Sequence, residues 1–226
     1  MIFKPNFSIA VVGLGYVGLP LGLALSRHFQ VIGFDSNAKR RRELIDGCDI
    51  TGEVGDQTLA NSNMEFADSI DDIRRCQLYI VTVPTPIDAR NEPDLTALRA
   101  ACGDVGSLLS AGDTVVFEST VYPGVTEDVC GPELERASGL RCGVDFFLGY
   151  SPERINPGDD QHTVENVCKV IAGQTPDVTA MLKQVYGDAL SGGVHVAPNI
   201  KTAEAAKVIE NAQRDINIAF VNEVAM

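Results

Sequence analysis

The sequence is poor in basic residues. Only 18 lysines and arginines stand against 31 aspartates and glutamates among 226 residues, which gives a formal net charge of −13. Nucleic acids and anionic membrane surfaces are bound through dense positive charge, so this balance argues against both as partners. An anionic small molecule can still bind, but only where local donors overcome the general repulsion.

Long apolar runs are also missing. No stretch approaches the roughly 20 apolar residues of a membrane-spanning helix. The opening MIFKPNF lacks the apolar core of a signal peptide, so we expect a cytoplasmic protein. With 45% hydrophobic and 22% charged residues, the composition is ordinary for a globular protein with a substantial core. The length allows one large α/β domain, or one domain and the start of another.

Cysteine and histidine are few and scattered. The six cysteines form no CxxC motif and no paired spacing, so we expect reduced thiols rather than a disulfide framework. Neither the cysteines nor the three histidines lie in a pattern typical of a nucleophile or of metal ligands. The sequence therefore predicts no metal site.

What the sequence does contain is a glycine-rich turn between two apolar segments. Residues 9–35 indicate a strand, the turn Gly13-x-Gly15-x-x-Gly18, an apolar helix and a second strand that ends at Asp35. Gly13 allows a tight turn, Gly15 lets the backbone approach a pyrophosphate, and Gly18 lets the helix pack close to the strand. The helix then points its unpaired N–H groups at the phosphates. This combination predicts a dinucleotide site.

Asp35 also discriminates between cofactors. Its carboxylate can accept both hydrogen bonds of a ribose diol and would repel a 2′-phosphate, so NAD is favoured over NADP. Arg40, Arg41 and Arg42 follow closely and could reverse that preference. For at least two of them, a solvated helix face is the simpler interpretation. Arg40 is kept as a candidate cofactor contact.

Strand and helix patterns alternate along the rest of the chain. Continuous apolar strands separated by helices are typical of a parallel sheet covered on both faces. The sequence therefore predicts an α/β fold, a Rossmann-like, doubly wound, mostly parallel sheet with helices on both faces, over residues 1–198. After the glycine turn we expect strands at 63–67, 77–84, 113–120, 146–150, 169–172 and 194–197. Helices are expected at 37–46, 94–110, 126–138 and 176–190, with a polar loop before residue 63.

Residues 199–226 differ in kind from the sheet region. Their apolar residues follow helical spacing and define one face: Val208, Ile209, Ala212, Ile216, Ala219, Phe220 and Val224. Lys207, Asn211 and Arg214 share the opposite face. The chain stops without a Gly, Asn or Pro that would end the helix. We expect the first helix of a central domain, cut short in a chain taken from a longer protein.

Five motifs in a fixed order carry a family resemblance. They are GLGYVGLP at 13–20, VPTP at 83–86, ESTVYPG at 118–124, SPERINPG at 151–158 and AEAAKVIENAQRDINIAF at 203–220. Together they resemble the UDP-glucose/GDP-mannose dehydrogenase family. The last two motifs are most similar to its UDP-N-acetylhexosamine 6-dehydrogenase branch (N-acetylglucosamine or N-acetylgalactosamine), which serves surface-polysaccharide synthesis.

The resemblance implies an NAD-dependent oxidation of a UDP-sugar. Enzymes of this family oxidise the C6 alcohol to a carboxylate in two hydride transfers. A cysteine thiolate captures the intermediate aldehyde, and the resulting thioester is hydrolysed. That cysteine lies in a glycine-rich motif of the family's C-terminal domain, beyond this chain. The family also builds its dimer on the long helix, so we expect a homodimer or larger assembly.

The resemblance also assigns residues to the cofactor. Tyr16 and Val17 lie at the N-terminus of the first helix, where backbone donors meet the pyrophosphate. Thr85 and Thr120 match positions beside the ribose and nicotinamide, and Thr120 is also expected at the reacting centre. Ligands of parallel sheets bind beyond the carboxyl ends of the strands, where both threonines fall. From the sequence alone, both could equally be helix caps or turn formers.

Further residues match the substrate and catalytic positions of the family. Glu153 resembles the acid that handles the water or the proton during thioester hydrolysis. Lys207 would stabilise a developing alkoxide at O6 or donate a proton, and Asn211 would orient the same oxygen or a water. Arg154 and Ile155 match contacts to the sugar nucleotide. The simpler interpretation of Glu153 is a surface glutamate before a loop. For Lys207, Asn211 and Arg214 it is a solvated helix face.

Two positions bear on the substrate. Arg214 would reach the diphosphate or the sugar. UDP-glucose dehydrogenases usually carry a second glutamate four residues after the first, and here Pro157 takes that position, which fits the acetamido-sugar branch better. The motifs leave the epimer open. The alternatives are a β-hydroxyacid or 6-phosphogluconate-type NAD dehydrogenase with a single hydride transfer, or an NAD-binding module without turnover.

Overall fold

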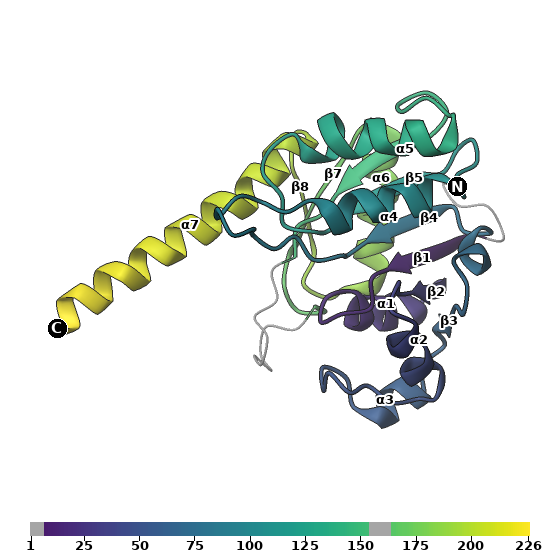
Figure 1. The fold of residues 1–226 in the computed structure, drawn as a ribbon, viewed down its shortest axis with the longest axis horizontal. Helices are drawn as coiled ribbons and strands as arrows, with labels where there is room; N and C mark the ends of the chain where they lie inside the picture. Colours follow the sequence, from purple (N-terminus) through teal and green to yellow (C-terminus); the bar gives the residue numbers. More distant parts are fainter. Residues whose placement is uncertain (1–6, 154–163) are drawn as a thin grey trace.

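The apolar strand segments pair into one eight-stranded sheet with the order β3-β2-β1-β4-β5-β6-β7-β8 (Figure 1). The computed structural model describes residues 7–153 and 164–226. Pairing is parallel throughout except between β6 and β7. The strands are β1 (Ser8–Val12), β2 (Gln30–Phe34), β3 (Glu65–Phe66), β4 (Leu78–Val81), β5 (Thr114–Phe117), β6 (Phe147–Tyr150), β7 (Lys169–Gly173) and β8 (Val194–Val196).

Helices cover both faces of this sheet. They are α1 (Gly18–Ser26), α2 (Ala38–Ile45), α3 (Asp56–Ala60), α4 (Thr96–Gly106), α5 (Gly131–Ser138), α6 (Pro176–Ala189) and α7 (Ile200–Ala225), with a 3₁₀ turn η1 (Ile70–Ile73) and a π-helix η2 (Val125–Cys130). Successive side chains of β1 point to opposite faces. Ala10 and Val12 pack in the core beneath α4 and α5, whereas Ile9 and Val11 pack beneath α1 and α6. The predicted doubly wound fold is confirmed.

The structure corrects two details of the prediction and adds the direction of one strand pair, which the predicted mostly parallel sheet left open. The β6–β7 pair is antiparallel, because a parallel pair needs a crossover that is usually a helix, and the sequence between these strands has no helical pattern. Helix α3 occupies part of the expected polar loop; it has five residues, too few to show helical periodicity. The single helix expected over 126–138 is instead η2 followed by α5.

Helix α7 projects from one end of the sheet, and the chain ends at its far tip (Figure 1). Its N-cap residue is Asn199, whose side-chain oxygen accepts a hydrogen bond from Thr202 N at 2.8 Å. Only Ile200, Ala203 and Glu204 of this helix are buried, and the rest is mostly exposed, including Phe220, which is 67% exposed. The predicted apolar face of this helix therefore lies largely uncovered by the described residues. No helix among those residues is long and apolar enough to cross a bilayer.

Candidate functional site

The carboxyl ends of β1, β2, β4 and β5 open onto a cleft of about 690 Å³. Small side chains of α4, such as Ala97 and Ala100, form part of its wall. Eight of the residues predicted for the site line this cleft: Gly13, Gly15, Tyr16, Val17, Asp35, Thr85, Thr120 and Glu153. The edge of the sheet therefore brings together residues that lie far apart in the sequence.

The glycine turn has the geometry that the sequence predicted. Gly13 adopts φ +98°, a left-handed conformation that favours glycine, and its N–H donates to Phe34 O at 2.8 Å. A Cβ on Gly18 would lie 1.9 Å from Gly13 O, so only glycine lets α1 start this close to the turn. A Cβ on Gly15 would meet nothing within 4 Å. Gly15 therefore leaves open space on the cleft side of the turn.

The N-terminus of α1 is the natural place for a phosphate. Its N-cap residue, Val17, makes no side-chain capping hydrogen bond, and no acidic residue lies in the first turn. Tyr16, Val17 and Gly15 line the cleft at this point. The helix dipole and its unpaired N–H groups favour an anion there. A dinucleotide pyrophosphate fits these features.

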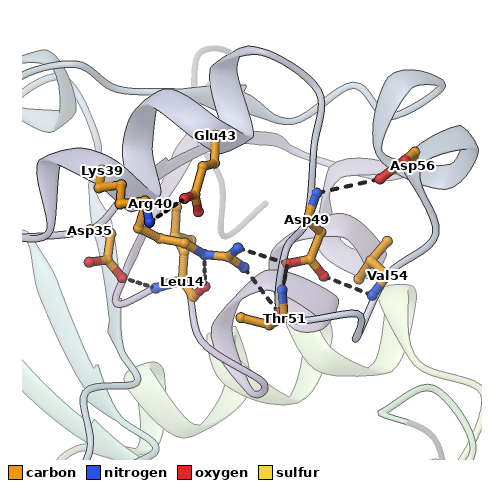
Figure 2. Close-up of polar contacts among 9 residues, drawn as sticks. All are labelled: Leu14, Asp35, Lys39, Arg40, Glu43, Asp49, Thr51, Val54 and Asp56. Carbon is orange, nitrogen blue, oxygen red and sulfur yellow. Dashed lines mark hydrogen bonds and ion pairs between the residues drawn. The ribbon is translucent and has the colours of Figure 1, made fainter.

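Asp35 is held at the wall of the cleft by the backbone. Its Oδ2 accepts a hydrogen bond from Leu14 N at 2.8 Å (Figure 2), and its Oδ1 accepts one from Asn37 N, also at 2.8 Å. These bonds fix the carboxylate beside the glycine turn while lone pairs remain for a ribose diol. The geometry supports the predicted role of Asp35 in selecting NAD.

Arg40, a candidate cofactor contact, lies behind the glycine turn. It does not line the cleft; its side chain is 8% exposed and forms a 2.7 Å ion pair with Asp49 (Figure 2). Its Nε donates to Leu14 O at 3.0 Å, inside the glycine turn. Asp49 also accepts hydrogen bonds from Thr51 Oγ1 at 2.6 Å and Val54 N at 2.9 Å. Arg40 therefore braces the turn from behind, and its contact with the cofactor stays a prediction.

We expect Asp49→Asn to lower the free energy of unfolding at neutral pH by ~3 kcal/mol, because Arg40 is left buried without its countercharge. Burial would raise the pKa of Asp49, but hydrogen bonds from Thr51, Arg40 and Val54 outweigh it and lower that pKa below 3.8. Because the pKa of Asp49 is lower in the folded state, its carboxylate contributes its full stabilisation above the unfolded-state pKa. This contribution is lost as the pH falls through the folded-state pKa.

Urea unfolding of the wild type and the Asp49→Asn variant, at neutral pH and near pH ~3, measures this effect. The difference between the two proteins should shrink at the acidic pH, because Asp49 of the unfolded wild type then takes up a proton more readily than Asp49 of the folded protein. Exposed Asp46→Asn is the matched control and should change the unfolding free energy little. A difference that stays constant with pH would contradict the ion-pair interpretation.

Three hydroxyl groups tie together the loops that follow the strands. Thr85 Oγ1 donates to Thr120 O at 2.5 Å, and Ser119 Oγ donates to Val83 O at 2.6 Å. Thr82, which sequence reasoning missed, donates from Oγ1 to Gly13 O at 2.6 Å. The Thr85 hydroxyl is bonded to the neighbouring loop. Thr85 therefore has a structural role in this loop, as the alternative interpretation of it as a turn former expected. Thr82 could have been noticed only as a hydroxyl at the end of β4.

Glu153 is backed by a buried polar group that sequence reasoning did not single out. Lys169 Nζ lies 2.6 Å from Glu118 Oε2 and 3.0 Å from Glu153 Oε2. Tyr186 Oη donates to Glu118 Oε1 at 2.5 Å. The sequence did carry a sign of this group. Glu118 ends the otherwise apolar strand segment VVFE, and Lys169 begins the otherwise apolar segment KVIAG.

The remaining predicted residues lie elsewhere. Lys207 is half-buried, Asn211 and Arg214 are exposed, and all three lie on α7 outside the lining of the cleft. Arg214 pairs with Glu210 one turn away, at 3.0 Å. The structure therefore does not bring these three side chains to the cleft. Arg154 and Ile155 lie outside the described residues.

One missed residue fixes the start of α7. The carboxylate of Glu204 is fully buried and accepts hydrogen bonds from Gly124 N at 2.6 Å and Thr126 N at 2.9 Å. These donors open the π-helix η2, so the charge lies at the positive end of a helix. Lys201 adds an exposed ion pair with Asp128 at 3.0 Å. The long helix is thus attached to the sheet domain by side chains of its first turn.

A doubly wound sheet with a glycine turn, an uncapped helix N-terminus and an acid at the end of β2 defines the dinucleotide-binding domain of a dehydrogenase. Comparison with known proteins makes the class specific. The model of the UDP-glucose/GDP-mannose dehydrogenase family, NAD binding domain, matches residues 7–190. The chain belongs to this family, as its motifs predicted, and its cofactor is NAD.

Several relatives cover nearly the whole chain. Protein CapL of Staphylococcus aureus is 52% identical over 98% of the chain and 52% of its own length. UDP-N-acetyl-D-glucosamine 6-dehydrogenase of Pseudomonas aeruginosa is 50% identical over 98% of the chain and 53% of its own length. A solved structure of a UDP-D-ManNAc dehydrogenase from Pyrococcus horikoshii superposes with a TM-score of 0.86 at 31% identity, over 96% of this chain and 53% of that one. The chain thus spans about half the length of these relatives.

Proposed function

We propose that the complete protein oxidises the C6 alcohol of UDP-N-acetylglucosamine to the carboxylate, with NAD as the oxidant, in surface-polysaccharide synthesis. The observation that carries the proposal is the difference in similarity between two groups of relatives. Two UDP-N-acetyl-D-glucosamine 6-dehydrogenases are each 50% identical to the chain. The UDP-N-acetyl-D-mannosamine dehydrogenases are 30% to 33% identical over a similar length. This difference favours the gluco epimer, which the motifs left open.

The overall reaction consumes one alcohol, one water and two NAD⁺, and it yields one carboxylate, two NADH and three protons. NAD supplies the hydride acceptor in both oxidations. We assign its ribose to Asp35 and its pyrophosphate to Gly15 and the N-terminus of α1. Thr85 and Thr120 are assigned to the nicotinamide side. These assignments place the reacting end of the cofactor beside Thr120, on the side of the cleft lined by Glu153.

We assign to Glu153 the handling of water in the hydrolytic step. A carboxylate can accept a proton from a water that attacks the acyl carbon, if it lies within hydrogen-bond reach of that water. Glu153 supports the assignment because its side chain is 10% exposed and lines the cleft. The nucleophilic cysteine of the resemblance is proposed to lie outside this chain.

We further propose that residues 1–198 form the NAD-binding domain and 199–226 the first helix of a central domain. In the complete protein this helix would carry Lys207, Asn211 and Arg214 towards the sugar nucleotide, and Arg154 and Ile155 would contact it from the sheet domain. The exposed apolar face of α7 supports a homodimer or larger assembly. The net charge of −13 supports an enzyme without nucleic acid or membrane partners, and we propose that it is cytoplasmic.

The number of NADH molecules formed per sugar tests the proposal. With protein from the full open reading frame and limiting UDP-N-acetylglucosamine, we expect two NADH per sugar and slower turnover with the manno epimer. UDP-glucose is the control that lacks the acetamido group. One NADH per sugar, or turnover of small β-hydroxyacids alone, would contradict the proposal and favour the single-transfer alternative. An absence of any turnover would favour an NAD-binding module.

A further inference from the structure

Four side chains form a buried polar row beside the cleft, which both Glu153 and Glu118 line. Glu153 follows β6, Lys169 opens β7, Glu118 follows β5 and Tyr186 lies on α6. The side chains of Glu153, Lys169 and Glu118 are 10%, 4% and 0% exposed, so exposure falls along the row. Lys169 Nζ also lies 5.7 Å from the centre of the Tyr186 ring. Glu153 is the member of the row that faces the cleft most openly.

The fold by itself gives no reason for this arrangement. A buried ion pair costs desolvation, and apolar residues of similar volume often stabilise a core at least as well. The surrounding sheet core is apolar: Ile171 and Leu182 are both fully buried and belong to the same hydrophobic cluster as Tyr186. Buried charges in an apolar core are explained if the carboxylate of Glu153, the most exposed of the row, has to be held in one orientation.

We propose that Lys169 is a positioning residue that fixes the Glu153 carboxylate in the cleft and supplies its buried countercharge. This inference rests on the proposed function, because it concerns the residue that handles water there. Lys169 Nζ has three donor positions, and two of them are directed at Glu118 and Glu153. Glu118 is held in turn by the Tyr186 hydroxyl. The ammonium group is thereby fixed between two carboxylates.

The charges in the row are consistent with this role. The titratable groups that face Lys169 come from each element around it: Glu118, Glu153 and Tyr186. Burial raises the pKa of Glu118 above its ordinary value, although Lys169 opposes the shift. Burial by itself would lower the pKa of Lys169, but the two carboxylates outweigh it and raise that pKa. Lys169 therefore stays charged between the two carboxylates.

The test uses protein from the full open reading frame and two variants, Lys169→Met and Glu118→Gln/Lys169→Met. For Lys169→Met we expect kcat at neutral pH to fall by about tenfold or more, with KM changed less than about twofold, because Lys169 does not reach the substrate. We also expect the acidic limb of the kcat profile to move up by roughly one pH unit, because the base has lost its countercharge. Lys183→Met, an exposed position on α6, is the matched control.

The double variant separates positioning from folding. Lys169→Met leaves two carboxylates buried without a cation and is expected to lower Tm, whereas the added Glu118→Gln change removes one of these charges and should recover most of that loss. If Lys169 positions Glu153, the double variant still shows the low kcat and the shifted limb. A wild-type profile in either folded variant would overturn the inference. Glu153→Gln distinguishes the two proposals, because normal turnover in that variant would refute the role of Glu153 itself.

Discussion

Gly18→Ala is expected to abolish measurable NAD binding and to lower Tm by roughly 10 °C. The added Cβ would lie 1.9 Å from Gly13 O and 2.4 Å from Thr82 Oγ1. The first contact is with backbone, so relief requires α1 to move away from the glycine turn. The turn is itself fixed, because Gly13 N donates to Phe34 O at 2.8 Å. Forcing a group into such a site costs ~3 kcal/mol, at the upper end for overpacking.

Gly15→Ala provides the matched control for this prediction. A Cβ at Gly15 meets nothing within 4 Å, so we expect the variant to keep the wild-type Tm. NAD affinity should still fall by about tenfold or more, because the methyl group would stand where the backbone approaches the pyrophosphate. Differential scanning fluorimetry measures the first effect and isothermal titration calorimetry the second.

The two variants can fail in different ways. A Gly18→Ala protein with unchanged Tm would show that α1 moves easily relative to the turn. A Gly15→Ala protein with normal NAD affinity would show that the pyrophosphate does not lie against Gly15. Only the combination of a destabilised Gly18→Ala variant and a stable, weakly binding Gly15→Ala variant supports separate roles for the two glycines.

The glycine turn was predictable because its chemistry is local. Gly13, Gly15, Gly18 and Asp35 lie within one strand-turn-helix-strand unit, so their spacing specifies both the backbone and the position of the acid. The sheet was also predictable, because apolar strand segments alternate with helical patterns along the chain. The direction of the β6–β7 pair was left open, because a run of apolar residues does not encode strand direction.

Arg40 shows why the rest of the site was less accessible. Helical spacing places it on α2, but the direction of its side chain depends on Asp49 in a later loop, and no local pattern records that pairing (Figure 2). Lys169 was missed for a similar reason, because its partners Glu118 and Glu153 follow other strands. Long-range ion pairs of this kind are determined by the tertiary fold, and a single sequence does not reveal them.

Glu204→Ala is expected to lower the free energy of unfolding by ~3 kcal/mol, because two N–H groups at the start of η2 lose a buried, charged acceptor. Gly124 N and Thr126 N are those donors, at 2.6 and 2.9 Å from the carboxylate. The more informative effect is on catalysis. Lys207 and Asn211 follow on the same helix within two turns, so a change at its base displaces both.

In protein from the full open reading frame, kcat of Glu204→Ala should therefore fall by about a hundredfold, the loss expected from a small misplacement of catalytic groups. NAD affinity should stay within about twofold of the wild type, because Glu204 does not line the cleft. Glu223→Gln, exposed near the end of α7, is the control and should match the wild type in both respects. If Glu204→Ala keeps full kcat despite lower stability, the attachment of α7 to η2 supports the fold alone. If kcat and NAD affinity fall together, the substitution has also disturbed the nucleotide cleft. The loss of kcat would then not show that the first turn of α7 positions Lys207 and Asn211.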